Sequence, residues 1–170
     1  KVREKYNDII TIIAPRHINR CKEISALSNK LNLKTQILNE GELISNQKEV
    51  ILINSFGALQ EYFKYAKSVF IGKSILKRLS RDGGQNPIDA AKLQCKIYHG
   101  PYVYNFQEIY EIFEEKNITN KINSYEELSE KLIEDLKSPS KGSVKNLEFI
   151  EDLGKRTLND TMKSINNFIE

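Results

Sequence analysis

A stretch of nine residues, 81–89, carries the pattern in this sequence that best suggests chemistry, and it is called the glycine loop below. It reads Arg-Asp-Gly-Gly-Gln-Asn-Pro-Ile-Asp, with Gly83 and Gly84 adjacent. Glycine adopts backbone conformations closed to other residues and lets N–H groups approach a ligand closely. Pro87 suits the first position of a helix, whose positive dipole end would then face the loop. The pattern predicts an anion site, most often for phosphate, and an ordinary turn is the alternative.

Apolar runs on both sides of the glycine loop predict the elements that hold it. Residues 69–72 precede the loop, and residues 95–98 follow a helix predicted over 87–93. Residues 8–14 and 50–53 are near-continuous aliphatic runs, which is typical of strands covered on both faces of a parallel sheet. We therefore expect the glycine loop to join a strand to a helix within a larger α/β arrangement.

Strands and helices alternate along most of the chain. Short strands are predicted over 34–38 and 118–122, and helices from about residue 19 and over 58–66, 105–113, 124–136 and 144–170. Apolar side chains at helical spacing are expected to pack: Ile24, Leu27 and Leu31 in the first helix, and Leu147, Ile150, Leu158, Met162, Ile165 and Ile169 in the last. Asn105 and Ser124 each precede a glutamate by three residues, so each predicts a capping box that begins a helix.

This alternation predicts an α/β fold, namely a Rossmann-like parallel sheet with helices on both faces and a helical C-terminal tail. We assign residues 1–137 to this domain, and residues 138–170 to a linker and C-terminal helices that pack on the same domain. In such sheets, ligands bind at the carboxyl ends of the strands. Four polar segments are expected at that edge: Pro15-Arg16-His17, Ser55-Phe56-Gly57, Lys73-Ser74 with Gly83-Gly84, and Gly100-Pro101.

Composition narrows the function classes. The 170-residue chain carries a net charge of +3 that is spread along its length, so no nucleic-acid partner is expected. Cys21 and Cys95 lack metal-ligand spacing and cannot make a disulfide framework, which favours reduced thiols and a cytoplasmic setting. No apolar run approaches the ~20 residues that span a bilayer. The sequence begins at Lys1 rather than Met, so we expect a piece of a longer protein.

A set of short motifs runs in order along the chain. The motifs are Ile13-Ala14-Pro15-Arg16-His17 followed by Arg20, then Asn54-Ser55-Phe56-Gly57, Phe70-Ile71-Gly72-Lys73-Ser74, Gly83-Gly84-Gln85-Asn86-Pro87-Ile88-Asp89, Gly100-Pro101 and Asn105-Phe106. In order and spacing, this set resembles the C-terminal half of the 3-deoxy-D-manno-octulosonic acid (Kdo) transferases. The resemblance covers about residues 8–115. It implies half of a GT-B glycosyltransferase, an enzyme of two Rossmann-like domains that transfers Kdo from CMP-Kdo to a lipid A precursor at the cytoplasmic face of the bacterial inner membrane.

Within this family the C-terminal domain holds the nucleotide donor. The resemblance implies that the catalytic base, the acceptor site and the membrane anchor belong to the N-terminal half, so no catalytic residue is expected in this fragment. We expect the fragment alone to be soluble and inactive. The resemblance also implies that the enzyme needs no metal or other cofactor.

The donor-binding residues are carried over from the resemblance by position. Pro15 and Arg16 would contact the CMP phosphate and cytidine, with His17 beside them. The remaining members are Ser55, Phe56 and Gly57 along the nucleotide, Ser74, Gly83, Gly84 and Asn86 toward the donor phosphate or Kdo carboxylate, Gln85 through its amide, and Asp89 toward the ribose hydroxyls. A surface ion pair is the alternative role for Arg16, and a helix cap is the alternative for His17. Asn105 is explained by its capping box and His99 by a structural role, so neither is given a ligand.

Four positions depart from the family pattern. Asn54 stands where Asp is usual, Ala58 where Glu is usual, Lys73 where Gly is usual, and Gln85 where His is usual. Ala58 removes an acceptor, and Gln85 cannot titrate near neutral pH. Two further hypotheses therefore stay open: another GT-B glycosyltransferase or an epimerase that uses a UDP-sugar, and a non-catalytic domain whose site has decayed.

Overall fold

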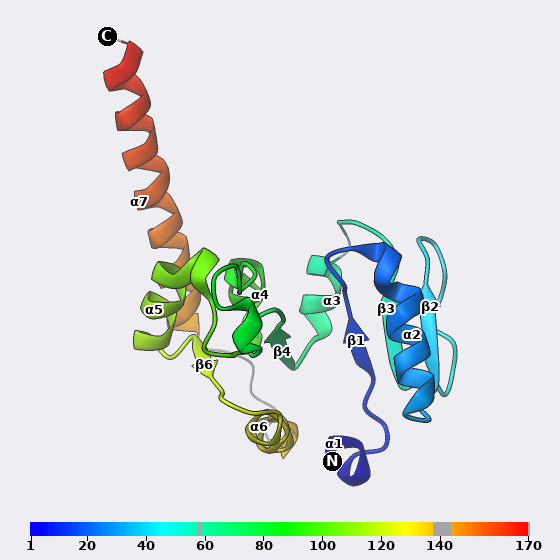
Figure 1. Cartoon of the computed structure of the whole chain (residues 1–170). Coiled ribbons are helices and arrows are strands. Elements are labelled where there is room, and N and C mark those ends of the chain that lie inside the picture. Colours follow the sequence, from blue (N-terminus) through cyan, green and yellow to red (C-terminus); the bar gives the residue numbers. More distant parts are fainter. Residues whose placement is uncertain (58, 138–143, 170) are drawn as a thin grey trace. The chain divides into compact units, whose positions relative to one another are not determined.

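The computed structural model describes residues 1–57, 59–137 and 144–169. The chain divides into two compact units, Lys1–Tyr62 and Phe63–Glu170, and each contains its own three-stranded parallel sheet (Figure 1). The predicted class, parallel strands flanked by helices with a helical C-terminal tail, is confirmed. The predicted domain limits stay a prediction, and the start of the predicted linker, 138–143, lies outside the described residues.

The first unit is built around its central strand. Its elements are α1 (Val2–Lys5), β1 (Thr11–Ile13), the 3₁₀ turn η1 (Ile18–Arg20), α2 (Cys21–Lys30), β2 (Thr35–Leu38) and β3 (Val50–Ile53), with sheet order β1-β3-β2. All four residues of β3 are buried. Val50 and Leu52 pack in a cluster with Cys21 of α2, while Ile51 and Ile53 pack with Leu38. The aliphatic pattern of β3 thus reflects cover on both faces.

Two expectations for this unit were wrong. The run 8–14 was predicted to be a strand buried on both faces, but β1 covers only Thr11–Ile13, and Ile10 and Ile12 are 47% and 39% exposed. β1 is an edge strand with β3 as its one neighbour, so it has fewer partners to cover its side chains. In α2, Ile24 packs on the core, whereas Leu27 and Leu31 are exposed, because Cys21 and Ser28 occupy the buried face.

The second unit begins within helix α3 (Leu59–Tyr65) and contains β4 (Ser68–Ile71), β5 (Lys96–His99) and β6 (Thr119–Lys121), with sheet order β4-β5-β6. The other elements are the 3₁₀ turns η2 (Lys77–Leu79) and η3 (Tyr104–Phe106) and the helices α4 (Ile88–Lys92), α5 (Gln107–Glu115), α6 (Tyr125–Lys137) and α7 (Val144–Ile169). Every strand predicted from sequence is found, with bounds that differ by a few residues. None of the described helices has the length and apolarity needed to cross a membrane.

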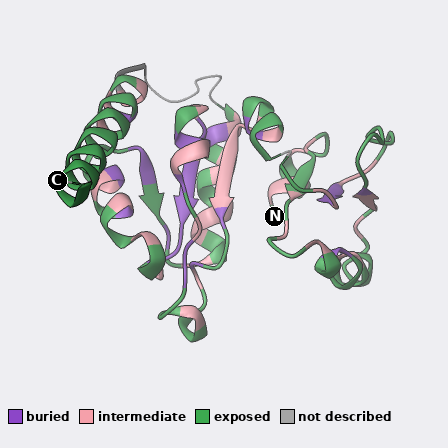
Figure 2. Ribbon diagram, turned by 90° about the horizontal axis from the view of Figure 1, so that it is seen from above, coloured by how far each residue is buried: buried purple, intermediate pink, exposed green. Residues whose placement is uncertain are grey.

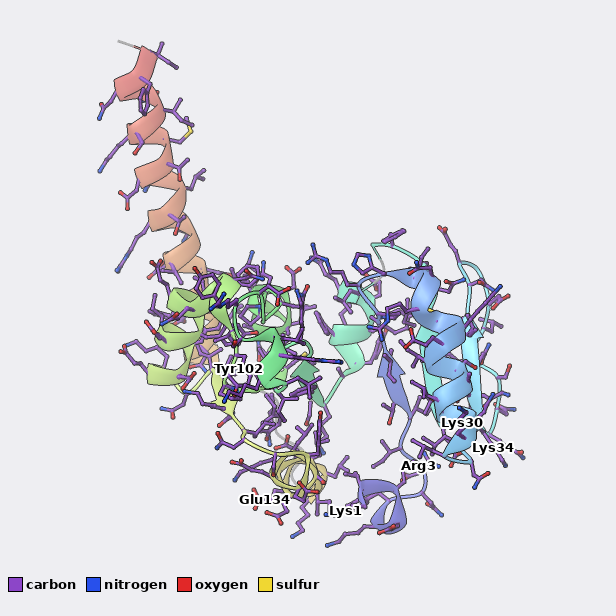
Figure 3. All side chains as sticks on the ribbon, viewed as in Figure 1. Lys1, Arg3, Lys30, Lys34, Tyr102 and Glu134 are labelled. Atoms are coloured by element: carbon purple, nitrogen blue, oxygen red, sulfur yellow. The ribbon has the colours of Figure 1, made fainter. Side chains whose placement is uncertain are left out.

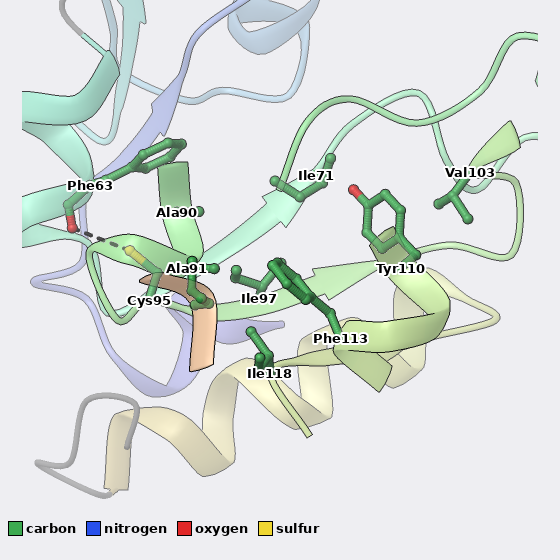
Figure 4. Packing of buried hydrophobic residues seen from close by; sticks show 11 residues of the cluster. Phe63, Ile71, Ala90, Ala91, Cys95, Ile97, Val103, Tyr110, Phe113 and Ile118 are labelled. Atoms are coloured by element: carbon green, nitrogen blue, oxygen red, sulfur yellow. Dashed lines mark hydrogen bonds between the residues drawn. The ribbon is translucent and has the colours of Figure 1, made fainter. Parts of the chain in front are cut away.

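The core of the second unit forms around β5 and α5. Ile97, Tyr110 and Phe113 are completely buried and pack with Ala90 and other residues of the cluster (Figure 4). The start of α7 joins this core through Ile150, which is 3% exposed. Its distal half is exposed, including four of the apolar residues predicted to pack, Leu158, Met162, Ile165 and Ile169 (Figure 2). That packing expectation was therefore right for the first turns of α7 and wrong beyond them.

Candidate functional site

The two glycines of the glycine loop are required by the close approach of other backbone segments. A Cβ on Gly83 would lie 2.5 Å from the carbonyl oxygen of Tyr102 and 2.8 Å from that of Lys73. Gly84 has φ +84°, and a Cβ there would lie 2.9 Å from Val103 Cα. Figure 3 labels Tyr102, in the segment that follows β5. The adjacent glycines therefore let the loop lie against the chain after β5, which an isolated turn would not need.

Ser74 and Gly100 tie the segments that follow β4 and β5. The Ser74 side chain is completely buried, and its hydroxyl donates to the Ile71 carbonyl at 2.6 Å. The same oxygen accepts a hydrogen bond from the Gly100 N–H at 2.8 Å. Both hydrogen-bonding functions of this hydroxyl are thus used inside the protein. A contact between Ser74 and a ligand stays a prediction.

Lys73 occupies a backbone conformation that favours glycine. Its φ is +60°, and its carbonyl accepts a hydrogen bond from the Gly84 N–H at 2.8 Å. The ammonium lies 2.9 Å from the Asp82 carboxylate in an exposed ion pair. The left-handed backbone gives a physical reason for the glycine that is usual at this position in the resembling family.

Replacing Lys73 with glycine is expected to stabilise the unit slightly, despite the loss of the ion pair. Relief of the left-handed conformation is worth about 1 kcal/mol, whereas an exposed pair contributes between 0 and about 1 kcal/mol. Lys73→Ala is the matched control, because it also removes the pair but keeps a Cβ at positive φ. In urea denaturation, the free energy of unfolding of Lys73→Gly should be about 1 kcal/mol higher than that of Lys73→Ala. Equal values would contradict the proposed backbone strain at residue 73.

The helix after the glycine loop is shorter than predicted. α4 spans Ile88–Lys92, five residues, in place of the predicted 87–93. The Asn86 side-chain oxygen accepts the Ile88 N–H at 2.9 Å, so one N–H at the helix start already has a partner. So short a helix adds only a weak dipole, so its positive end contributes less to an anion site than a helix over 87–93 would. Asp89 lies half-buried in its first turn.

Asn105 does not form the predicted capping box. α5 begins two residues later, at Gln107, after the 3₁₀ turn η3, and no side chain caps it. The Asn105 side-chain amide instead donates to the Asp82 carbonyl at 2.9 Å, and its backbone N–H donates to the Gly83 carbonyl at 3.2 Å. The box at Ser124 is confirmed, since the Ser124 hydroxyl accepts the Glu127 N–H at 3.1 Å. Only the fold reveals that Asn105 holds the glycine loop, because the two segments are distant in sequence.

Gln85 and His99 are connected to the core by Tyr110. The Tyr110 hydroxyl donates to the Gln85 carbonyl at 2.8 Å, and burial raises the pKa of this phenol well above its usual value. The His99 ring lies 4.3 Å from the Tyr110 ring, and its Nδ1 is 2.8 Å from the Gly100 carbonyl oxygen. Burial lowers the pKa of His99, which favours the neutral imidazole. These contacts agree with the structural role expected for His99.

The site residues of the first unit follow two neighbouring strands. Residues 15–17 come after β1 and residues 54–57 come after β3, and these strands are parallel and paired. Both segments therefore lie at the carboxyl edge of the same sheet. In the second unit, Lys73 and Ser74 after β4 and Gly100 after β5 share an edge for the same reason. Each unit thus gathers its predicted site residues at one sheet edge.

Individual residues at the edge of the first unit differ in exposure. Arg16 and His17 are exposed, and Phe56 is 76% exposed. His17 stands before η1, where its carbonyl accepts the Arg20 N–H but its side chain makes no capping hydrogen bond. Gly57 has φ +83° with open space around it.

Two of the departures from the family pattern fall on this unit. The Asn54 amide donates to the Asn39 side-chain oxygen at 2.8 Å, so the residue has an internal partner in place of a charge. Ala58 lies outside the described residues.

Comparisons with known proteins point to the family that the motifs resemble. No protein-family model matches the chain. The chain is 26% identical over 132 residues to a 3-deoxy-D-manno-octulosonic acid transferase from Haemophilus influenzae, covering 78% of the chain and 30% of that protein. It is 24% identical to the enzyme of the same name from Aquifex aeolicus over 134 residues, which cover 79% of the chain and 35% of that protein. It is also 24% identical to the enzyme of the same name from Rickettsia prowazekii, over 99% of the chain and 36% of that protein.

A solved structure extends this similarity to the fold. The C-terminal CMP-Kdo binding domain of WaaA from Acinetobacter baumannii matches with a TM-score of 0.72 and 22% identity, over 90% of this chain and 76% of that one. The chain spans about a third of the length of the curated relatives it matches. This chain is therefore similar in sequence, over most of its length, to Kdo transferases, and similar in fold to the C-terminal CMP-Kdo binding domain of one of them, as its ordered motifs predict.

Proposed function

We propose that this chain is the donor-binding domain of a glycosyltransferase that transfers Kdo from CMP-Kdo to a lipid A precursor in lipopolysaccharide biosynthesis. One observation carries the proposal: in each unit, the motifs shared with Kdo transferases fall at the carboxyl edge of a parallel sheet. This is the edge at which open α/β sheets bind ligands. The full enzyme would act at the cytoplasmic face of the inner membrane, with the acceptor, the catalytic base and the membrane contact supplied outside this chain.

The proposed chemistry of this half is to orient the donor and stabilise its leaving group. Transfer by displacement at the Kdo anomeric carbon releases CMP, whose phosphate carries negative charge. The Arg16 guanidinium suits that phosphate, because it can donate two parallel hydrogen bonds. A backbone N–H of the glycine loop suits the phosphate or the Kdo carboxylate, whereas that of Gly84 already donates to the Lys73 carbonyl. Asp89 would accept hydrogen bonds from the ribose hydroxyls.

The remaining proposed contacts shape the nucleotide site. Pro15 and His17 flank Arg16, and Ser55, Phe56 and Gly57 would lie along the base and ribose. Asn86 is partly committed to the start of α4, and Ser74 holds the segment below the glycine loop, so we propose that both act mainly by keeping the loop in shape.

A calorimetric titration of CMP into the chain tests this function. Binding should weaken about ten- to hundredfold in Arg16→Ala, because a hydrogen bond to a charged group contributes roughly 1.5–3 kcal/mol. Lys30→Ala is the matched control, since it removes one exposed positive charge from the same unit at the end of α2 (Figure 3). Equal affinity of the Arg16 and Lys30 variants would remove Arg16 from the proposed site.

The departures at Asn54, Lys73 and Gln85 favour a second candidate, a domain whose donor site has decayed. The Asn54 amide and the Lys73 ammonium are both engaged within the protein, at 2.8 Å and 2.9 Å from their partners. This candidate predicts no change in melting temperature at millimolar CMP. A parallel titration with UDP separates the third possibility, because a UDP-sugar enzyme should bind UDP more tightly than CMP.

A further inference from the structure

We propose that Asn105 is a positioning residue that directs the Gly83 N–H toward the anion of the donor. This inference rests on the proposed function and goes beyond it, because Asn105 itself would touch no ligand. It starts from the two hydrogen bonds that Asn105 makes to consecutive carbonyls of the glycine loop, those of Asp82 and Gly83.

The peptide between Gly83 and Gly84 is held at both ends. Its carbonyl accepts the Asn105 backbone N–H at 3.2 Å, and its N–H donates to the Lys73 carbonyl at 2.8 Å. A peptide plane fixed at both ends cannot rotate to offer either group to a ligand. This peptide therefore holds the loop in place, and neither its carbonyl nor its N–H is available to bind a ligand.

The peptide between Asp82 and Gly83 is held at one end alone. Its carbonyl accepts the Asn105 side-chain amide at 2.9 Å. Within the part of the chain that the structure describes, the Gly83 N–H has no hydrogen-bond partner, although Gly83 is buried. Cis peptide bonds are absent from the described residues, so this N–H points away from the carbonyl that Asn105 holds. The direction of the remaining donor is thus set by Asn105.

An unpaired buried N–H is costly, so its presence in a folded protein calls for a reason, such as a ligand that supplies the acceptor. An anionic oxygen, from a phosphate or a carboxylate, is the acceptor that gains most from a preorganised backbone donor. The Lys73 ammonium holds the Asp82 carboxylate at 2.9 Å, so Asp82 is restrained through both its side chain and its carbonyl. That pairing also offsets the negative charge of Asp82, which would repel an anion near this donor.

The side-chain chemistry of asparagine suits this task. Its amide supplies the N–H that the Asp82 carbonyl requires, whereas an aspartate of the same shape offers no donor. The backbone N–H of the same residue holds the next carbonyl, and this pair of contacts depends on the 3₁₀ turn η3 around Asn105. Asn105→Asp is therefore a near-isosteric variant that removes one donor and keeps the turn, but it also adds a negative charge that repels an anion, so Asn105→Ala carries the comparison of affinities.

The test is a titration of CMP into ¹⁵N-labelled wild type, Asn105→Ala and Asn105→Asp, followed at the Gly83 amide and by calorimetry. Loss of one hydrogen bond that orients a donor should weaken CMP binding about three- to tenfold. The Gly83 amide signal should move on CMP addition in the wild type and move much less in both variants. Ser124→Ala is the control, because it removes one side-chain hydrogen bond at the start of α6, in the same unit, without touching the glycine loop.

The outcomes separate the inference from the function on which it rests. Wild type that fails to bind CMP would overturn the proposed function and this inference together. Wild type that binds CMP, with both Asn105 variants binding equally well, would overturn the inference alone. An equal loss in Ser124→Ala would show a general effect of reduced stability and would also overturn it. Asn105→Leu, which has a similar shape but neither a charge nor a donor, keeps the test decisive if Asn105→Ala unfolds.

Discussion

Replacing Gly100 with alanine is expected to destabilise the second unit by about 3 kcal/mol or more. An added Cβ would collide with the Ser74 carbonyl and would lie 2.5 Å from Ile75 Cα. Both are backbone atoms, so the collision cannot be relieved by a change of rotamer. The end of β5 would have to separate from the segment after β4. That movement breaks the hydrogen bonds from Gly100 N–H to the Ser74 hydroxyl and from Tyr102 N–H to the Ser74 carbonyl, both 2.8 Å long.

Urea denaturation of two further alanine variants provides the comparison. Gly72 and Gly154 have nothing within 4 Å of an added Cβ. Gly72→Ala should leave the free energy of unfolding nearly unchanged. Gly154→Ala, inside α7, should raise it by up to about 1 kcal/mol, because alanine is the better helix former. A loss below 1 kcal/mol in Gly100→Ala would show that the segments after β4 and β5 are not packed as described.

Replacing Asp135 with alanine is expected to cost about 3–4 kcal/mol. The carboxylate, on α6, is 5% exposed and accepts hydrogen bonds from three side chains. The distances are 2.6 Å to the Ser68 hydroxyl, 2.8 Å to the Lys96 ammonium and 2.9 Å to the Tyr98 hydroxyl. These donors belong to β4 and β5, so one side chain links a helix to two strands. Its removal leaves a poorly exposed ammonium and a buried phenol without their acceptor.

The neighbour Glu134 provides the control for Asp135. Glu134 is exposed and pairs with Lys131 at 3.2 Å, one turn away on the same helix (Figure 3). Glu134→Ala should therefore change the free energy of unfolding by less than about 0.5 kcal/mol. The loss of free energy of unfolding in Asp135→Asn should lie between those of the two alanine variants. An amide oxygen still accepts from the Tyr98 hydroxyl but does not balance the Lys96 charge. Equal losses in the Asp135 and Glu134 alanine variants would contradict the proposed link between α6 and the strands.

Much of the fold could be predicted because its strands have strong local patterns. The run 50–53 is aliphatic throughout, and β3 is buried on both faces. The errors have one physical source, since a local pattern does not specify what an element packs against. Leu27 and Leu31 match a helical stripe, yet the sheet of their unit meets Cys21 and Ile24 instead. Likewise, Leu158 and Met162 continue the apolar stripe of α7, but only the first turns of this helix contact the core.

The candidate site likewise has features that the sequence predicts and features that depend on tertiary contacts. The motif order, the glycines and the strand ends that present them can be recognised along the chain, because each depends on nearby residues. The function of Asn105 could not be recognised in this way. In sequence it matches a capping box, but its donors meet Asp82 and Gly83, more than twenty residues away.

The amino-acid order thus establishes which elements form and which residues reach the carboxyl edges of the sheets, since periodicity, turns and glycine conformations are local properties. Tertiary packing establishes which carbonyls and donors already have partners. The Ser74 hydroxyl already donates one hydrogen bond and accepts another, and the Asn86 side-chain oxygen already accepts one. The Gly83 N–H is left unpaired among the described residues. These states follow from the meeting of segments that are distant in sequence, after β4 and β5.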